Sequence, residues 1–115
     1  MGRRLLLGVA LLMTATLASA AADGRVHVLV ADDDGIDAPG LEALVAALVA
    51  DPGYRLTVVA PAEQQSGQGH ALVIRGEIAV TPHPPIHGAP SWAVAATPAT
   101  AVKVGLSTLL VDDPP

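Results

Sequence analysis

Three consecutive aspartates, Asp32, Asp33 and Asp34, end an otherwise largely apolar run near the start of the chain. Like charges at one point repel one another, so crowded carboxylates either show raised pKa values or share a hard cation, which prefers oxygen ligands. Gly35 follows directly and allows the backbone to turn tightly. The alternative is a solvated loop whose acids only favour the dipole of a following helix. Spacing alone leaves both interpretations open.

A second polar stretch, Pro61 to Gly69, contains Ser66 and Gly67. Here Ser66 can supply a hydroxyl ligand, and the backbone N–H groups of the loop can bind an anion. A Ser-Gly pair taken alone is usually only a turn. The histidines show no compact metal-ligand spacing, and none is assigned to catalysis; they are His27, His70, His83 and His87. His70, which directly follows this polar stretch, is the least implausible of them.

Two short apolar runs rich in β-branched residues carry these loops. Arg25 to Ala31 and Tyr54 to Ala60 each have the composition of a buried parallel strand. Between them, Leu41 to Ala50 is rich in helix formers, and Pro39 fits the first turn of a helix. We therefore expect a βαβ unit with a right-handed crossover. Since ligands bind beyond the carboxyl ends of parallel strands, both polar loops should face one edge of the sheet.

The second half of the chain is predicted to add further elements to an α/β fold with a mainly parallel sheet. Leu72 to Pro85 looks like a hairpin or extended ribbon that turns at Arg75-Gly76. The run Pro82 to Pro90 has too many prolines for a sheet centre, so we expect an exposed excursion. Ser91 to Ala96 is predicted to be a strand, and Thr97-Pro98 to begin a helix. A doubly wound sheet needs another strand after that helix, so we expect the fold to continue beyond Pro115.

The first twenty residues have the features of a secretory signal peptide: Arg3 and Arg4, an apolar run, and a small-residue ending at Ala20. The apolar run is short for a bilayer crossing, which needs about 20 residues, so an uncleaved anchor is the alternative. We therefore divide the chain into a signal peptide, 1–20, and a mature domain, 21–115. The mature chain is expected to be secreted or periplasmic and free of the membrane.

Charge and composition exclude several classes of protein. Cleavage after Ala20 removes two arginines and no acids, so the formal charge of -5 becomes -7. An acidic chain argues against binding a nucleic acid polymer, which requires a basic face. A bound divalent cation would reverse the sign of the charge locally. Cysteine is absent, so no disulfide framework supports the domain.

Three blocks of sequence, Leu29 to Leu48, Val58 to Leu72 and Ala96 to Leu106, resemble in order and spacing the SurE survival-protein family of nucleotidases. The resemblance extends from about Arg25 to Pro115. It implies a Rossmann-like three-layer α/β domain that hydrolyses nucleoside monophosphates with a divalent metal, most often magnesium or manganese. An all-oxygen donor set agrees with such a cation, since hard cations take carboxylate and hydroxyl ligands.

Carried over by motif, the resemblance places metal ligands at Asp33, Asp34 and Ser66. Gly35 and Gly67 are candidates for substrate contact through their backbones, and no side chain is assigned as the general base. The family usually has Asn at the position of Asp32, so this chain adds a negative charge beside the site. It also usually has Gly at the position of Ala96.

The resemblance also implies parts that would follow Pro115. These are a Ser-Gly-Ile-Asn motif with an asparagine ligand and a phosphate loop, and later segments through which the family forms homo-oligomers. Whether this chain is an enzyme therefore stays open, and the alternative is an inactive, truncated fragment that binds metal without turnover. A receiver-like signalling domain is a further alternative, but the later strands end without the phospho-accepting aspartate that it needs.

Overall fold

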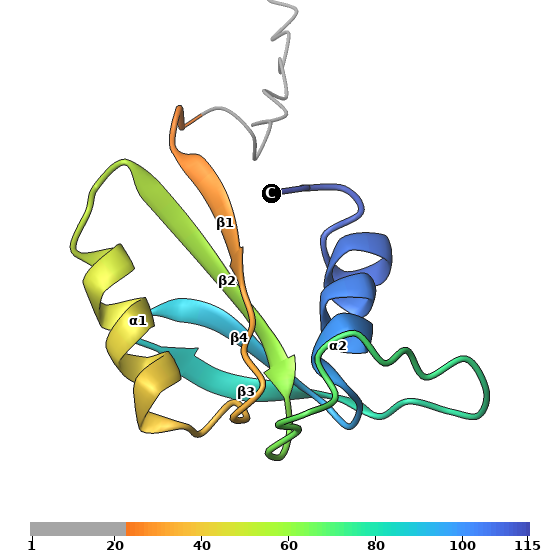
Figure 1. Ribbon diagram of the computed structural model, residues 1–115. Coiled ribbons are helices and arrows are strands. Elements are labelled where there is room, and N and C mark those ends of the chain that lie inside the picture. The colour runs from red at the N-terminus through yellow and green to blue at the C-terminus, as the bar shows by residue number, and fades with distance from the viewer. Residues whose placement is uncertain (1–22) are drawn as a thin grey trace, which may run out of the picture.

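The computed structural model describes residues 23 to 115, and the signal peptide predicted for residues 1–20 lies outside the described residues. A four-stranded sheet has the order β1-β2-β4-β3. Three of its strands are parallel, and β3 runs antiparallel to β4. One helix covers each face of the sheet, α1 on one side and α2 on the other (Figure 1). The elements are β1 (Val26–Val30), α1 (Pro39–Val49), β2 (Tyr54–Pro61), β3 (Val80–Ile86), β4 (Ala89–Val94), α2 (Pro98–Val104) and a π-helical turn, η1 (Gly105–Leu109). The predicted three-layer α/β architecture is confirmed.

The predicted βαβ unit forms from β1, α1 and β2. The two strands pair in parallel, with Val26 opposite Tyr54 and Val30 opposite Val58. Pro39 begins α1, where its missing N–H costs nothing, and the extended residue before it, Ala38, gives no side-chain cap. The helix runs back across the sheet and ends before the Asp51-Pro52-Gly53 turn, which leads into β2.

The core consists of two apolar layers separated by the sheet. Side chains alternate along β2, so Leu56 and Val58 pack toward α1 while Val59 packs toward α2. The layer under α1 includes Leu41 and Val45, which lie on its buried face. Because both faces of β2 are covered, the strand is buried along nearly its whole length, as its continuous apolar sequence predicted.

The segment from Leu72 to Pro85 differs from its prediction. The structure has only a bend at Arg75-Gly76, and no strand lies between Leu72 and Ala79, so the hairpin alternative is wrong. Of the extended ribbon that was the other alternative, only the part from Val80 onward is a strand. The hairpin is formed instead by β3 and β4 around His87-Gly88, where both residues have positive φ, 47° and 81°. Sequence alone misplaced the turn because Arg75-Gly76 and His87-Gly88 are equally plausible turn sites until β4 selects its partner.

The expected exposed excursion from Pro82 to Pro90 is also partly wrong, because most of it belongs to β3 and β4. Its prolines are tolerated since β3 is an edge strand, paired with β4 on one side only among the described residues. The ladder is irregular between His83 and Ile86, and the strand is mostly exposed. The composition therefore indicated correctly that this segment does not occupy the sheet centre.

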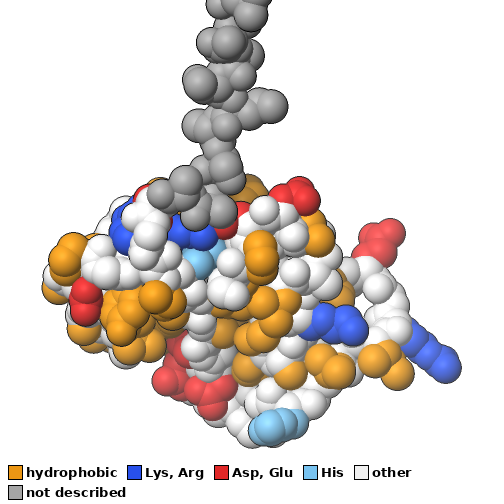
Figure 2. All heavy atoms as spheres, turned by 90° about the horizontal axis from the view of Figure 1, so that it is seen from above, with side chains coloured by type: hydrophobic (Ala, Val, Ile, Leu, Met, Phe, Trp, Pro, Cys, Tyr) orange, Lys and Arg blue, Asp and Glu red, His pale blue; other side chains and the backbone are white. Residues whose placement is uncertain are grey.

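Some large hydrophobic side chains remain on the surface. Ile74 is 84% exposed in the segment between β2 and β3, and Val26 and Val111 are each 59% exposed near the amino end of the sheet. Figure 2 shows such side chains spread over one face of the molecule, with small groups of acidic side chains among them. The described part of the chain thus has apolar surface beyond its two core layers.

Candidate metal and substrate site

The carboxyl ends of the three parallel strands meet at one edge of the sheet, as the sequence predicted (Figure 1). Two loops extend from this edge: the acidic loop, residues 31–38 after β1, and the serine loop, residues 62–70 after β2. Backbone hydrogen bonds join them to each other and to the strands. The N–H of Gln65 donates to the carbonyl of Asp33 at 2.6 Å, and the N–H of Ile36 donates to that of Pro61 at 2.8 Å. The predicted ligands therefore lie on two loops that are held directly together.

Gly35 allows this close contact between the loops. Its φ is +98°, a conformation that L side chains rarely adopt. A Cβ at this position would lie 3.1 Å from the backbone carbon of Glu63 and 3.3 Å from the backbone nitrogen of Gln64. The glycine predicted from the sequence to make a tight turn thus has a second role, because a Cβ here would force the backbone of the serine loop to shift by a few tenths of an ångström.

The carboxylates of the acidic loop lie in two different environments. Asp33 and Asp34 are exposed, and so is Ser66, which follows Gln65 in the serine loop. Both carboxylate oxygens of Asp32 are buried and have no hydrogen-bond partner. Burial raises the pKa of Asp32, and the charges of Asp34 and Asp33 act in the same direction, while nearby backbone amides partly offset them. Of the three adjacent acids, Asp32 is therefore the one whose carboxylate the fold shields from solvent.

These groups fit a hard divalent cation through the chemistry of their donors. Two exposed carboxylates, a hydroxyl on the adjoining loop and the unpartnered oxygens of Asp32 are all oxygen donors. Within residues 23–115, no group of three or more histidine, aspartate or glutamate side chains is arranged to hold a metal. Magnesium typically takes only one or two carboxylates and completes its shell with water and substrate phosphate. An open arrangement of this kind suits a cation that takes only some of its ligands from the protein and the rest from water and substrate.

Two of the histidines make contacts that do not involve Asp33 or Asp34. His27 is buried on the sheet face that α2 covers, where its Nε2 is 2.8 Å from the hydroxyl of Thr57. His83 reaches the last part of the acidic loop, with its Nε2 2.9 Å from a carboxylate oxygen of Asp37. No catalytic role was predicted for these side chains, and the structure shows His27 and His83 in structural contacts.

Sequence analysis missed a cavity at the same edge of the sheet. Its volume is about 350 Å³, and its lining comes from the serine loop, the turn after β4 and one residue of the segment before β3. The lining residues are Ala62, Glu63, Gln65, Val73, Ala95, Ala96 and Thr97. All of them except Val73 lie just after the carboxyl ends of β2 and β4, where α/β folds bind ligands, so the sequence could have indicated a binding site there. What the sequence could not show is that Val73, in a segment without regular structure, also lines the cavity.

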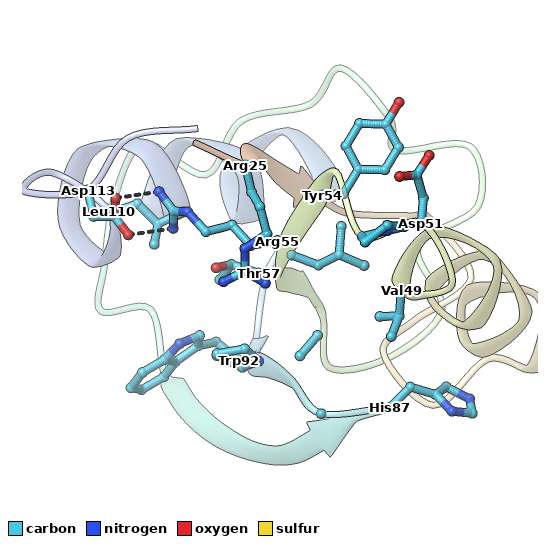
Figure 3. A pocket seen from close by; sticks show the side chains of 15 residues that line it. Arg25, Val49, Asp51, Tyr54, Arg55, Thr57, His87, Trp92, Leu110 and Asp113 are labelled. Carbon is cyan, nitrogen blue, oxygen red and sulfur yellow. Dashed lines mark hydrogen bonds and ion pairs between the residues drawn. The ribbon is translucent and has the colours of Figure 1, made fainter. Parts of the chain in front are cut away.

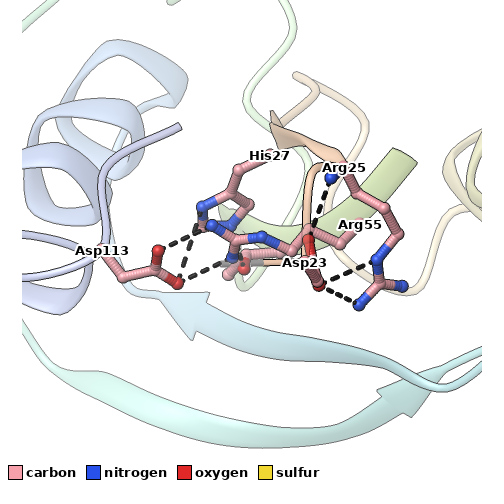
Figure 4. A network of polar contacts seen from close by, with 6 residues as sticks. Asp23, Arg25, His27, Arg55 and Asp113 are labelled. Carbon is pink, nitrogen blue, oxygen red and sulfur yellow. Dashed lines mark hydrogen bonds and ion pairs between the residues drawn. The ribbon is translucent and has the colours of Figure 1, made fainter. Parts of the chain in front are cut away.

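A larger cavity, of about 550 Å³, lies at the opposite edge of the sheet (Figure 3). It contains Arg25 and Arg55, but both guanidinium groups already have carboxylate partners (Figure 4). Arg55 donates two hydrogen bonds, of 2.6 and 2.7 Å, to Asp113, and Arg25 is 2.6 Å from Asp23. Since its positive charges are paired and the predicted ligands lie at the other edge, this cavity is not the candidate site.

Comparison with known proteins agrees with the geometry. The family model described as "Survival protein SurE" matches residues 28–115. A 5'-nucleotidase SurE of Synechococcus sp. (strain JA-3-3Ab) is 39% identical over 93 residues, 77% of this chain and 35% of the relative. The protein of that name from Desulfatibacillum aliphaticivorans is 42% identical over 89 residues, 77% of this chain and 34% of the relative. One from Chlamydia muridarum (strain MoPn / Nigg) is 41% identical over 93 residues, 79% of this chain and 32% of the relative. The chain spans about a third of the length of these curated relatives.

Proposed function

This chain belongs to the SurE survival-protein family, and from that membership we propose that it acts as a divalent-metal-dependent nucleotidase on nucleoside monophosphates. One observation carries the proposal: the loop with Asp33 and Asp34 is hydrogen-bonded through Asp33 to the loop with Ser66. The relatives that match it are named as 5'-nucleotidases. The arrangement lies at the sheet edge where α/β folds bind ligands.

The metal ligands in this proposal are Asp33, Asp34 and Ser66, and the cation is Mg or Mn. When bound, such a cation polarises a phosphoryl oxygen and lowers the pKa of a coordinated water molecule. The chain itself supplies two exposed anionic side chains and one hydroxyl on adjoining loops. Without a cation, these carboxylates would repel a phosphate group, so substrate binding is expected to depend on the metal.

The two glycines of the site, Gly35 and Gly67, both have backbone conformations with positive φ that other residues rarely adopt. Gly35 keeps the acidic loop against Glu63, as its contact distances require. Gly67 has a φ of +86° and no other group within 4 Å of where a Cβ would lie, so the backbone after Ser66 stays open. We propose that the open backbone at Gly67 lets a substrate phosphate approach the loop closely.

We also propose that the chain is exported, to the periplasm or outside the cell, through the signal peptide at residues 1–20. The support is the arginine pair, apolar run and small-residue ending of that segment. In the described residues, 23–115, no helix has the length and apolar character needed to cross a membrane. Fractionation of cells that express the chain, with N-terminal sequencing of the product, tests export and cleavage after Ala20.

Thermal unfolding of the mature chain tests the cation site. A ligand that binds only the folded state at one hundred times its Kd stabilises it by about 2.7 kcal/mol. For a domain of this size, that corresponds to a rise in midpoint of roughly 10 °C or more. We expect Mg or Mn to give such a rise over a chelator control, and Asp33→Asn to abolish it. The matched control is Asp112→Asn, which removes an exposed acid outside the site and should keep the rise.

Release of phosphate from nucleoside monophosphates, measured with Mg or Mn, then tests turnover. Hydrolysis that disappears in both Asp33→Asn and Asp34→Asn would support the proposed activity. A cation-induced rise without any phosphate release would indicate the alternative, metal binding without turnover. Equal loss of the rise in Asp33→Asn and Asp112→Asn would remove the site assignment.

A further inference from the structure

We propose that the 350 Å³ cavity beside the acidic loop is the subsite for the nucleoside part of the substrate, with Glu63 reading the ribose hydroxyls. The inference rests on the proposed nucleotidase function, since it assigns the phosphate to the loop that carries Asp33 and Asp34. The inference adds the place where the ribose and base bind, and the side chain that distinguishes a ribonucleoside from a nucleoside without 2'- and 3'-hydroxyls.

The cavity begins where the candidate metal site ends. Gln65 lines the cavity, and its backbone N–H donates to the carbonyl of Asp33 at 2.6 Å. Glu63 also lines it, while the backbone of Glu63 packs against Gly35. A phosphate held at the exposed aspartates would therefore have its esterified sugar at the mouth of this cavity.

The lining has both polar and apolar residues, as binding of a nucleoside requires. Glu63 and Gln65, the residues in contact with the acidic loop, are polar. The turn after β4 contributes Ala95 and Ala96, and the segment before β3 contributes Val73. Small apolar side chains leave room for a flat base. The volume of about 350 Å³ falls in the range of roughly 300–1,000 Å³ typical of small-molecule sites.

Glu63 is the group suited to the ribose. An ionised carboxylate only accepts hydrogen bonds, so it requires donors such as the 2'- and 3'-hydroxyls. The hydroxyl of Thr97, by contrast, is already occupied, because it donates to the carbonyl of Ala71 and lies 2.8 Å from the hydroxyl of Thr100. The lining has one carboxylate, Glu63, and one hydroxyl, Thr97. Of these two side chains, only Glu63 makes no side-chain hydrogen bond among the described residues.

The walls of the cavity are fixed before any ligand arrives. The N–H of Ala62 donates to the carbonyl of Val94 at 2.8 Å, and the N–H of Ala95 donates to that of Ala79 at 2.9 Å. The N–H of Val73 donates to the hydroxyl of Thr100 at 2.9 Å, which ties the segment before β3 to α2. A site held in this way loses little conformational freedom on binding, which favours affinity.

Adenosine, which has no phosphate, tests the subsite separately from the metal site. Isothermal titration of the mature chain should detect binding, and NMR should show amide shifts at Ala62, Ala95 and Thr97. Ala95→Leu fills the cavity and should weaken adenosine binding by about tenfold or more. Ala47→Leu makes the same change at an exposed position of α1 and should have no effect. Both variants should keep the stabilisation by Mn.

Two results would overturn this inference while leaving the proposed function intact. One is a wild-type chain that Mn stabilises but in which adenosine shifts none of the cavity amides. The other is equal adenosine affinity in Ala95→Leu and the wild type. If Mn gives no stabilisation either, the proposed function fails as well, so the two failures are distinguishable.

The role of Glu63 is tested with 2',3'-dideoxyadenosine, which has the base but neither hydroxyl. Wild type should bind adenosine more tightly than the dideoxy compound, by roughly 2- to 10-fold for the hydrogen bonds lost. Glu63→Ala should remove that preference by weakening adenosine alone. Equal weakening of both compounds would show that Glu63 does not read the ribose.

Discussion

Replacing Gly35 with alanine should separate the two loops of the candidate site. The new Cβ would lie 3.1 Å from the backbone carbon of Glu63 and 3.3 Å from the backbone nitrogen of Gln64. These are backbone atoms, so no side chain can rotate away to make room. The alanine must also adopt a φ of +98°. The substitution therefore combines a tight contact with backbone atoms and an unfavourable conformation.

Gly67→Ala is the matched control, because it isolates the conformational part of this cost. Gly67 has a similar φ, +86°, but nothing lies within 4 Å of the point that its Cβ would occupy. A positive φ costs an L residue about 1–2 kcal/mol, and the reduced freedom of the unfolded chain returns about 0.4–1 kcal/mol in both variants. Overpacking against fixed atoms adds about 1–3 kcal/mol for Gly35→Ala only. We expect Gly35→Ala to be the less stable variant by about 2 kcal/mol.

Urea unfolding of both variants measures this difference. With a denaturant slope of about 2 kcal/mol per M, 2 kcal/mol moves the midpoint by about 1 M. We also expect Mn to stabilise Gly35→Ala much less than Gly67→Ala, because only the first change moves the acidic loop away from the serine loop. Equal midpoints for the two variants would refute the argument that these loops are held in close contact at Gly35.

Three further substitutions test other parts of the structure. Asp32→Asn should raise the thermal midpoint of the cation-free chain at neutral pH, since it removes charge from two buried oxygens without partners. That gain should fade as the pH falls, because burial raises the pKa of Asp32 and the wild-type carboxyl then becomes neutral. Hydrogen bonds from Arg55 lower the pKa of Asp113 in the folded state. The Arg55–Asp113 pair therefore stabilises the fold fully at pH values above the ordinary Asp pKa of about 3.9. This stabilisation is lost as the pH falls through the lower pKa of the folded state. Urea titrations at a series of acidic pH values should show this loss in the wild type and a smaller one in Asp113→Asn. Thr97→Ala should cost about 1 kcal/mol by removing the cap of α2, measured by urea unfolding, whereas Thr97→Ser should retain most of it.

Local sequence patterns predicted much of the fold because short-range physics determines those elements. A β-branched apolar run makes β1 and β2, Pro39 begins α1, and Thr97 caps α2 through the N–H of Thr100. The parallel pairing of β1 and β2 followed from the helix between them, since such a connection returns the chain to the same edge. These predictions needed no information about distant residues.

The segment from Leu72 to Ile86 shows where that approach fails. Its prolines and polar residues are compatible with a loop, and only pairing with β4 makes Val80–Ile86 a strand. Edge pairing depends on a partner that lies later in the chain, so a local pattern cannot reveal it. The same reason explains the missed cavity, whose wall at Val73 is fixed by a hydrogen bond to Thr100.

For the candidate site, the sequence by itself determined which groups are present and that they follow two parallel strands. The sequence alone shows three adjacent carboxylates, a glycine after them, and a loop with a serine. Only the tertiary structure decided that the carboxylate oxygens of Asp32 are buried while Asp33 and Asp34 stay exposed, and that Gly35 packs on Glu63. Burial and close contact depend on atoms supplied by distant segments, so the environment of each carboxylate exists only once the loops have come together.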